Sequence, residues 1–238
     1  MSNSTSPAGL SDVSASEWSD INPRLARMAA ALRAGARLDS FCVLLELGPA
    51  LSETELSEIE TQTGTRLPGQ YRSFLLQAGN GGAGPHYGLC SLRKTDGTWE
   101  VDGDQGIATD MDRLAEPFRH TTAFYPPEFL PVEPTKTDFK TPGDYYDAAD
   151  KWDQRRWQVV DEHTCGLLYL CEIGCGLRIA LVVTGPARGG IWINRIAEGA
   201  GIEPLFDSDG APLTFTAWYR EWLDDMEETL RLPRWAET

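Results

Sequence analysis

The stretch GNGGAG, from Gly79 to Gly84, matches the pattern G-x-G-x-x-G of the phosphate turn in dinucleotide-binding domains. That turn needs a strand before it and a helix after it, so that the helix N-terminus faces the pyrophosphate. Here a helical pattern precedes the glycines, and Pro85 and an extended run follow them. The helix end beside the glycines is therefore a C-terminus, whose partial negative charge repels phosphate. The sequence argues against nucleotide binding at this loop.

The acidic stretch DGDQG, from Asp102 to Gly106, is similar to the beginning of a calcium-binding loop. An EF-hand loop that starts at Asp102 requires glycine at its sixth position and glutamate at its twelfth. Those positions hold Ile107 and Arg113. We interpret the stretch as a turn whose carboxylates are solvated.

Three cysteines and a histidine offer a possible zinc ligand set: Cys165, Cys171, Cys175 and His163. Their spacing lacks the C-x-x-C pair that makes such a prediction specific. In an extended chain Cys165 and Cys171 share one face with Leu167 and Tyr169, which is typical of cysteine as a small buried apolar residue. We predict no metal site and no cofactor.

The sequence has neither a G-x-S-x-G elbow nor a catalytic-cysteine signature, and we predict that the protein is not an enzyme. Imidazole titrates near neutrality, so a histidine could still act as an acid–base group. An alternative is therefore a small-molecule-binding protein or a hydrolase with a pocket near His86, His120 and the Trp-rich C-terminal region. Trp218 and Trp222 at helical spacing favour a core role instead.

The chain is strongly acidic, with 36 Asp and Glu against 21 Lys and Arg and a formal net charge of −15. Such a field repels nucleic acid and anionic lipid and attracts a basic partner. Residues 96–116 concentrate the acid, with a single basic residue, Arg113, among them. We predict a partner-binding surface at six carboxylates: Asp96, Glu100, Asp102, Asp104, Asp110 and Asp112. A second acidic group, on the last predicted helix, is expected to be its solvated face: Asp224, Asp225, Glu227 and Glu228.

Composition and sequence patterns also predict the cellular compartment of the protein. The longest apolar run, Ile179 to Val183, is far too short to cross a bilayer. The five cysteines are an odd set in a chain with a large predicted core, which favours a reducing compartment. Residues 1–20 are Ser-rich and acidic and do not have the pattern of a secretory signal, so we expect a flexible tail there. We predict a cytoplasmic protein.

Helix signals occur towards both ends of the chain. Asn22 is placed to cap a first helix, and Ser52 and Glu55 form a capping box for a second. Apolar spacing predicts further helices over 68–79 and 215–231.

Strand signals lie between these helices. Apolar extended runs are found over 41–47 and 87–92, as three runs within 166–194, and over 202–206. Residues 126–156 lack periodicity, and we expect mostly loop or an insertion there. Strands clustered centrally, with helices at either end, predict an α+β fold.

The segment LSETELSEIETQTGTRLPGQYRSFLLQAGNGGAGPHYGLCSL resembles the SUKH superfamily of fungal cell-wall assembly regulators and bacterial proteins encoded beside toxins. The residues that fit its signature include Leu67, Pro68, Tyr71, Asn80, Gly81, Gly82, Pro85, Tyr87 and Gly88. We interpret them mainly as fold determinants. Asn80 and the glycines close a helix with positive φ, and Tyr87 is expected to pack towards Tyr71 and Phe74.

The resemblance covers roughly residues 40–225 and implies a mainly antiparallel sheet, with N-terminal helices and a C-terminal helix packed on it. It implies a single domain over 21–238, with a variable acidic insertion at about 93–163. It also implies protein binding in place of catalysis, as in bacterial immunity proteins that neutralise a nuclease- or deaminase-type toxin by direct contact. Together with the charge, it predicts a basic toxin as the partner.

Overall fold

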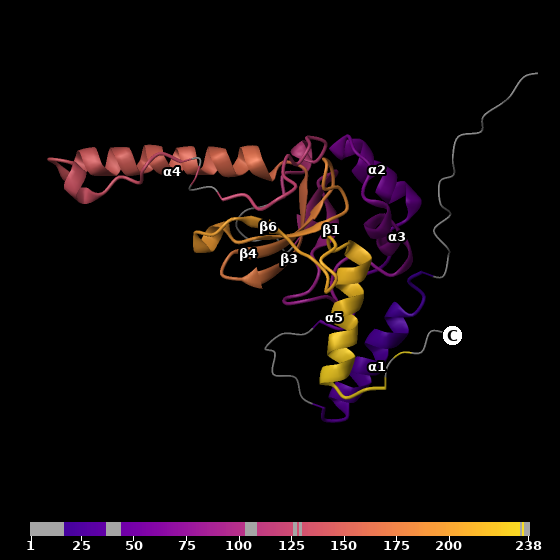
Figure 1. The fold of residues 1–238 in the computed structure, drawn as a ribbon. Coiled ribbons are helices and arrows are strands. Elements are labelled where there is room, and N and C mark those ends of the chain that lie inside the picture. Colours follow the sequence, from indigo (N-terminus) through magenta and orange to yellow (C-terminus); the bar gives the residue numbers. More distant parts are fainter. Residues whose placement is uncertain are drawn as a thin grey trace, which may run out of the picture.

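The structure is a computed structural model that describes residues 17–36, 44–102, 109–125, 128, 130–233 and 235. It has the predicted α+β architecture, with helices gathered against a central antiparallel sheet and one long helix that extends away from the body (Figure 1). Among the helices described, none combines the length and apolar composition that a bilayer crossing requires.

Four of the helices cover one side of the molecule: α1 (Ile21–Arg33), α2 (Glu53–Thr63), α3 (Gly69–Gln77) and α5 (Phe215–Thr229). Both α1 and α3 pack against α5. The capping box of Ser52 and Glu55 is confirmed, and α2 ends at Gly64 with φ of 67°. The first helix begins two residues earlier than predicted, because its N-cap is Asp20 and not Asn22. Asn22 lies inside the helix and donates from Nδ2 to the carbonyl of Ala78 at 3.2 Å.

The central sheet has the strand order β3-β4-β5-β6, with all neighbours antiparallel. Its strands are β3 (Leu167–Gly174), β4 (Leu177–Val182), β5 (Ile191–Asn194) and β6 (Ile202–Pro204). Apolar side chains are buried on both of its faces, because the helices cover one face and residues 118–124 with the end of α4 cover the other. A separate hairpin is formed by β1 (Ser91–Thr95) and β2 (Thr98–Asp102). Short 3-10 turns, η1 (Met111–Arg113), η3 (Lys136–Asp138) and η4 (Ile196–Glu198), lie in the connections.

The expectation of loop over 126–156 is wrong for its second half. Residues Pro142–Thr164 form α4, a 23-residue helix that Thr141 caps by accepting from the Asp144 N–H. Within α4 only Val159 and Val160 are buried, both near its C-terminal end. The helix lacks a continuous apolar stripe because most of it projects from the body, which removed the periodicity on which the prediction depended (Figure 1).

Two other expectations need correction at the N-terminal side. The strand predicted over 41–47 lies partly outside the described residues, and the part from Leu44 to Leu47 is irregular apart from an isolated bridge between Leu47 and Gly82. Trp18, which the sequence placed in the tail, is 1% exposed, and its Nε1 donates to Ser73 Oγ at 2.7 Å. The packed part of the chain therefore includes residues before 21.

Candidate protein-binding surfaces

The signature residues around the glycine loop form a corner between α3 and the β1–β2 hairpin. The Asn80 side chain pairs with the backbone of Leu92 as a neighbouring strand would. Its Nδ2 donates to the Leu92 carbonyl and its Oδ1 accepts from the Leu92 N–H, both at 2.8 Å. Gly82 has φ of 94°, and a Cβ there would lie 2.3 Å from the Glu46 carbonyl oxygen. Any side chain would therefore force the backbone apart. These contacts favour the structural interpretation of the block.

Most other members of the block are buried or pressed against backbone. Leu67, Tyr71 and Pro85 are buried, and a Cβ on Gly88 would lie 2.4 Å from the Gly82 carbonyl oxygen. The sequence prediction for Tyr87 is wrong. Its side chain is 53% exposed and lies beside Gly174 at the turn after β3, away from the core aromatics. Tyr87 has the exposure that a partner contact would need.

The six predicted acidic residues do not form one cluster. Asp96, Glu100 and Asp102 lie on the β1–β2 hairpin, whereas Asp110 and Asp112 flank the start of η1. Asp104 lies outside the described residues. Of the five that the structure describes, three thus lie together on one hairpin.

The hairpin carboxylates are partly neutralised by neighbours that precede them in the chain. Glu100 Oε1 accepts from Thr95 Oγ1 at 2.7 Å and from Arg93 Nη2 at 3.1 Å, and these two groups hold the pKa of Glu100 below its usual range. Arg93 Nη2 also lies 3.5 Å from Asp102 Oδ1. The charge of this surface is therefore weaker than the sequence stretch implied.

A second acidic surface follows the outer side of α5 and is hollowed into a groove of about 700 Å³, which we call the acidic groove. Its charged lining consists of Asp207, Glu221, Asp224, Asp225, Glu227 and Glu228 with Arg220 and Arg231. Glu221, Asp225 and Glu228 are exposed and have no ion-pair partner within the described part of the chain. They are free to meet a basic ligand.

Glu227, on the same helix, is buried, and the prediction that it is solvated is therefore wrong. Glu227 is 2% exposed and accepts two bonds from Arg24, from Nη2 at 2.9 Å and from Nε at 3.1 Å. Arg27 also donates to Glu227, and Asp224 pairs with Arg24 from the solvent side. These contacts hold α1 to α5, so the role of Glu227 is structural. The exposed carboxylates of α5 remain available to bind a partner.

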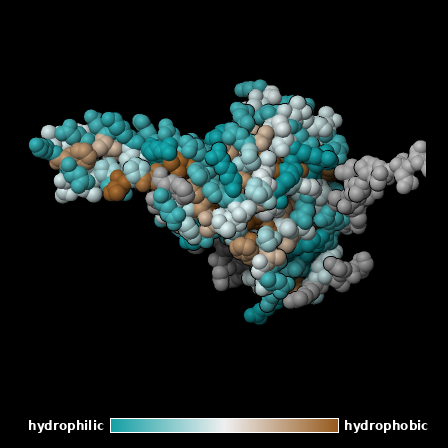
Figure 2. Space-filling model, turned by 45° about the horizontal axis from the view of Figure 1, so that its top comes forward, coloured by the Kyte–Doolittle hydropathy of each residue, from teal (hydrophilic) through white to brown (hydrophobic). Residues whose placement is uncertain are grey.

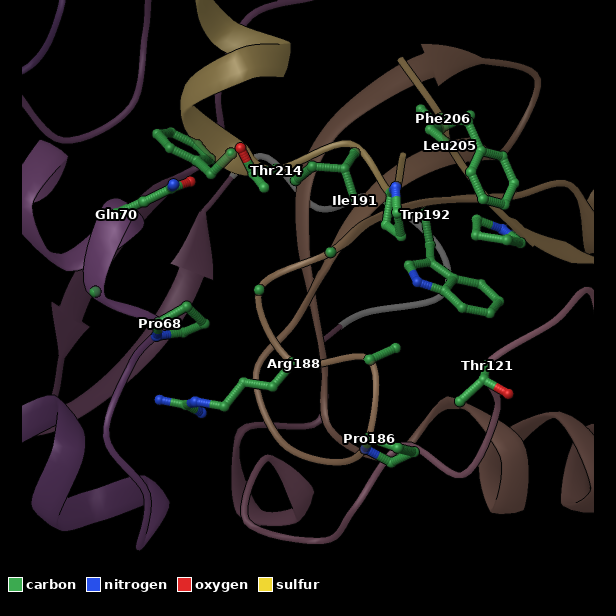
Figure 3. A pocket seen from close by; sticks show the side chains of 17 residues that line it. Pro68, Gln70, Thr121, Pro186, Arg188, Ile191, Trp192, Leu205, Phe206 and Thr214 are labelled. Atoms are coloured by element: carbon green, nitrogen blue, oxygen red, sulfur yellow. The ribbon is translucent and has the colours of Figure 1, made fainter. Parts of the chain in front are cut away.

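A third feature is an apolar groove of about 570 Å³ between the sheet and the N-terminal ends of α3 and α5 (Figure 3). Pro68 and Gln70 contribute one wall, and Trp192 and Phe206 lie together on the opposite wall. Arg188 lies between them and is engaged with protein, because its Nη2 donates to the Arg66 carbonyl at 2.6 Å. Sequence reasoning missed this groove because its walls come from five separate segments of the chain.

The surface of the projecting helix α4 is mostly hydrophilic with a few apolar residues (Figure 2), and two of its aromatic side chains are exposed. Tyr146 and Trp157 are 58% and 41% exposed. On another side of the helix, Trp152 Nε1 donates to the Pro131 carbonyl at 2.9 Å and lines a hollow of about 510 Å³.

The enzymatic alternative named His86 and His120, and the structure describes both residues. His86 is exposed on the glycine loop, and neither His86 nor His120 lines any of the three grooves described above. His120 Nε2 lies 2.8 Å from His163 Nδ1, and Phe124 stacks on both rings. Burial is the main cause that lowers the pKa of both imidazoles. The two rings form a packed pair at the C-terminal end of α4.

The cysteines of the zinc alternative lie in different surroundings. Cys165 ends α4, Cys171 is buried in the sheet, and Cys175 is exposed at the β3–β4 turn. Register shifts at Leu170 turn Cys171 to the opposite face from Tyr169, so the predicted shared face is wrong. In the described part of the chain no group of three or more His, Cys, Asp or Glu side chains could hold a metal ion.

An antiparallel sheet with helices packed on it, a GNGG corner and open surface grooves define an α+β domain. The chain belongs to the SMI1/KNR4 family (SUKH-1), which it matches over residues 50–209, about two thirds of its length. Proteins of this family are often immunity proteins. Comparisons with curated proteins and with solved structures gave no match.

Proposed function

We propose that this protein is a non-enzymatic immunity protein that neutralises a basic toxin, of the nuclease or deaminase type, by direct contact. The acidic groove along α5 is the observation that carries this proposal, because Glu221, Asp225 and Glu228 are exposed and unpaired among the described residues. Family membership supports a protein-binding role.

The physical argument rests on complementary charge. A toxin that acts on nucleic acid needs a basic channel, and a protein surface with unpaired carboxylates can occupy it. Such complementarity speeds association and excludes wrong partners more than it raises affinity by itself. The same charge disfavours nucleic acid or anionic membranes as partners. The hairpin carboxylates, with Asp104, would form a secondary contact.

We also propose the wider organisation that family membership suggests. The chain from Glu17 onward forms a single SUKH-type domain, whose core includes Trp18. Residues 93–163, which include the hairpin and α4, are a variable insertion. The proposed site of action is the cytoplasm.

Capture from a native lysate tests the proposal. The wild type and a variant with Glu221→Lys, Asp225→Lys and Glu228→Lys are compared at low and high salt, and the retained proteins are identified by mass spectrometry. We expect the wild type to retain a basic protein at low salt and the variant to lose it. A variant with Asp144→Lys, Asp147→Lys and Asp150→Lys on α4 is the control for charge alone. Equal retention by the wild type and the α5 variant would count against the acidic groove.

A further inference from the structure

Two arginines at the apolar groove carry charges that no carboxylate of the described residues compensates. Arg188 lines the groove, and Arg66 lies beside it, since the Arg66 carbonyl accepts from Arg188 Nη2 at 2.6 Å. Arg188 also donates from Nη1 to the carbonyl of Val183. Within the described part of the chain, neither arginine forms an ion pair. In a protein of net charge −15, this groove is therefore a place of local positive charge.

The surroundings of Arg188 favour an anion beside its guanidinium. Burial lowers the pKa of Arg188, and Arg66 acts in the same direction, so the charged form lacks stabilisation. Glu60 opposes this effect, but its carboxylate lies 3.2 Å from Arg72 Nε and is already engaged there. A carboxylate matches the planar fork of a guanidinium in shape and hydrogen-bond geometry. The two backbone carbonyls that Arg188 contacts leave other N–H groups of this fork to bind it.

The rest of the groove is apolar and has the size of a small-molecule site. Its volume is about 570 Å³, and pockets that bind small molecules commonly measure roughly 300–1,000 Å³. Figure 3 shows Trp192 and Phe206 on one wall, and the Arg188 side chain reaching towards Pro68 on the other. Phe206 is 55% exposed, so part of the aromatic wall is open to a ligand. A ligand that spans the groove meets rings at one side and a guanidinium at the other.

The backbone of the walls offers few donors to an extended peptide. The N–H groups of several wall residues already donate to protein carbonyls: Arg188, Gly189, Gly190, Ile191 and Leu205. Further wall residues are prolines, which have no N–H: Pro68, Pro186, Pro204 and Pro212. A peptide that adds to a sheet edge depends on free backbone groups. The groove therefore suits a compact apolar body with one anionic group better than an extended chain.

We infer that the apolar groove binds a small carboxylate with an aromatic or branched aliphatic body. The body packs against Phe206 and Trp192, and the carboxylate accepts hydrogen bonds from Arg188, with Arg66 adding to the positive potential. This site shares no lining residue with the acidic groove on α5. The protein would thus carry two sites for ligands of opposite charge.

Nuclear magnetic resonance titration of the full chain labelled with ¹⁵N tests the inference. The Trp192 indole N–H signal, assigned with Trp192→Phe, reports on the groove. The probes are 3-phenylpropionate, its neutral amide and acetate, which separate the contribution of the apolar body from that of the charge. We expect 3-phenylpropionate to shift the Trp192 signal with an affinity at least about tenfold above that of the amide, because hydrogen bonds between charged groups are the stronger ones. Acetate is expected to give no saturable shift.

Substitutions in the groove assign the contacts. Arg188→Gln should weaken the binding of 3-phenylpropionate about tenfold and that of the amide much less. Arg33→Gln removes an exposed arginine from the last turn of α1, and this matched control should change neither affinity. Arg188 also bonds to backbone carbonyls, so Phe206→Ser, at an exposed position, provides an independent test and should weaken both ligands.

Several outcomes would overturn the inference. They are equal affinities for the carboxylate and the amide, no saturable shift with either ligand, and affinities that are unchanged in both groove variants. A short acetylated peptide that ends in a phenylalanine carboxylate and binds more tightly than 3-phenylpropionate would show that the groove takes a chain terminus instead. No toxin and no residue of the acidic groove enters this experiment. Its failure therefore leaves the capture experiment unaffected.

Discussion

The two acidic surfaces of this protein differ in what surrounds their carboxylates. On the β1–β2 hairpin, Arg93 lies beside Glu100 and Asp102 and compensates part of their negative charge. On α5, the arginines from α1 are drawn inward to Glu227, and the neighbouring Glu228 remains exposed and unpaired within the described residues. Acidic composition alone therefore does not identify a binding surface. The position of the nearest guanidinium decides which carboxylates are available.

The largest expected effect comes from the buried member of the α5 face. Glu227→Gln leaves Arg24 in the interior with the solvent-side carboxylate of Asp224 and, at 3.8 Å, the carboxylate of Asp20 as its remaining ion-pair partners. We expect a loss of about 3 kcal/mol in the free energy of unfolding, at the lower end for removing one partner of a buried pair. Urea denaturation of the variant measures it. Glu228→Gln, one residue further along, is the matched control and should change stability by less than about 0.5 kcal/mol. Similar losses in both variants would contradict the division of this face.

The next effect concerns association through the exposed members. With the basic partner recovered by capture, Glu221→Lys, Asp225→Lys and Glu228→Lys together should slow association by roughly 10–100-fold at low salt, because the steering field is reversed. Stopped-flow kinetics over a salt series measures the rate. The difference from the wild type should shrink as salt rises, since exposed charges are screened. A rate that is insensitive to both the substitutions and salt would exclude electrostatic steering by α5.

A smaller effect is expected at the hairpin. Asp102→Lys with Asp104→Lys should slow the same association by roughly threefold and leave stability nearly unchanged, because the half-exposed Asp102 carboxylate is already partly compensated by Arg93 at 3.5 Å. The same stopped-flow series measures it. If this variant slowed association more than the α5 variant, the ranking of the two surfaces would be reversed.

The smallest expected effect is on pH dependence, at the histidine pair below α4. Burial lowers the pKa of His120 and His163, so the unfolded chain binds more protons than the folded chain as the pH falls below about 6.5. The pair therefore contributes stability above that pH, and this contribution is lost as the pH falls towards the lowered pKa. Arg119 acts in the same direction on both rings, whereas Glu162 opposes it at His163.

His120→Asn with His163→Gln removes this titration. Its free energy of unfolding should fall less than that of the wild type between pH 7.5 and 5.5, a window above the ordinary range of carboxylates. Urea midpoints at the two pH values provide the comparison. Identical changes in both proteins would show that the pair does not titrate on unfolding.

Much of the fold was predictable because its signals are local. The capping box at Ser52 and Glu55, the helix stop at Gly64 and the strands of the central sheet follow from short patterns that the structure confirms. The helix α4 was not predictable in this way, since its exposed surface has no apolar period. The candidate site was predicted only in part. The acidic residues were evident from the sequence, but the arginines that form ion pairs with them were not.

The sequence by itself determined the α+β class, the GNGG corner and the excess of negative charge, since each depends on residue types within a few positions of one another. Tertiary structure alone decided that Glu227 is buried against Arg24, 203 residues away in the chain. It also decided that Trp192 and Pro68 face each other across one groove. Pairing and groove formation depend on which distant segments pack together, and no local pattern records that.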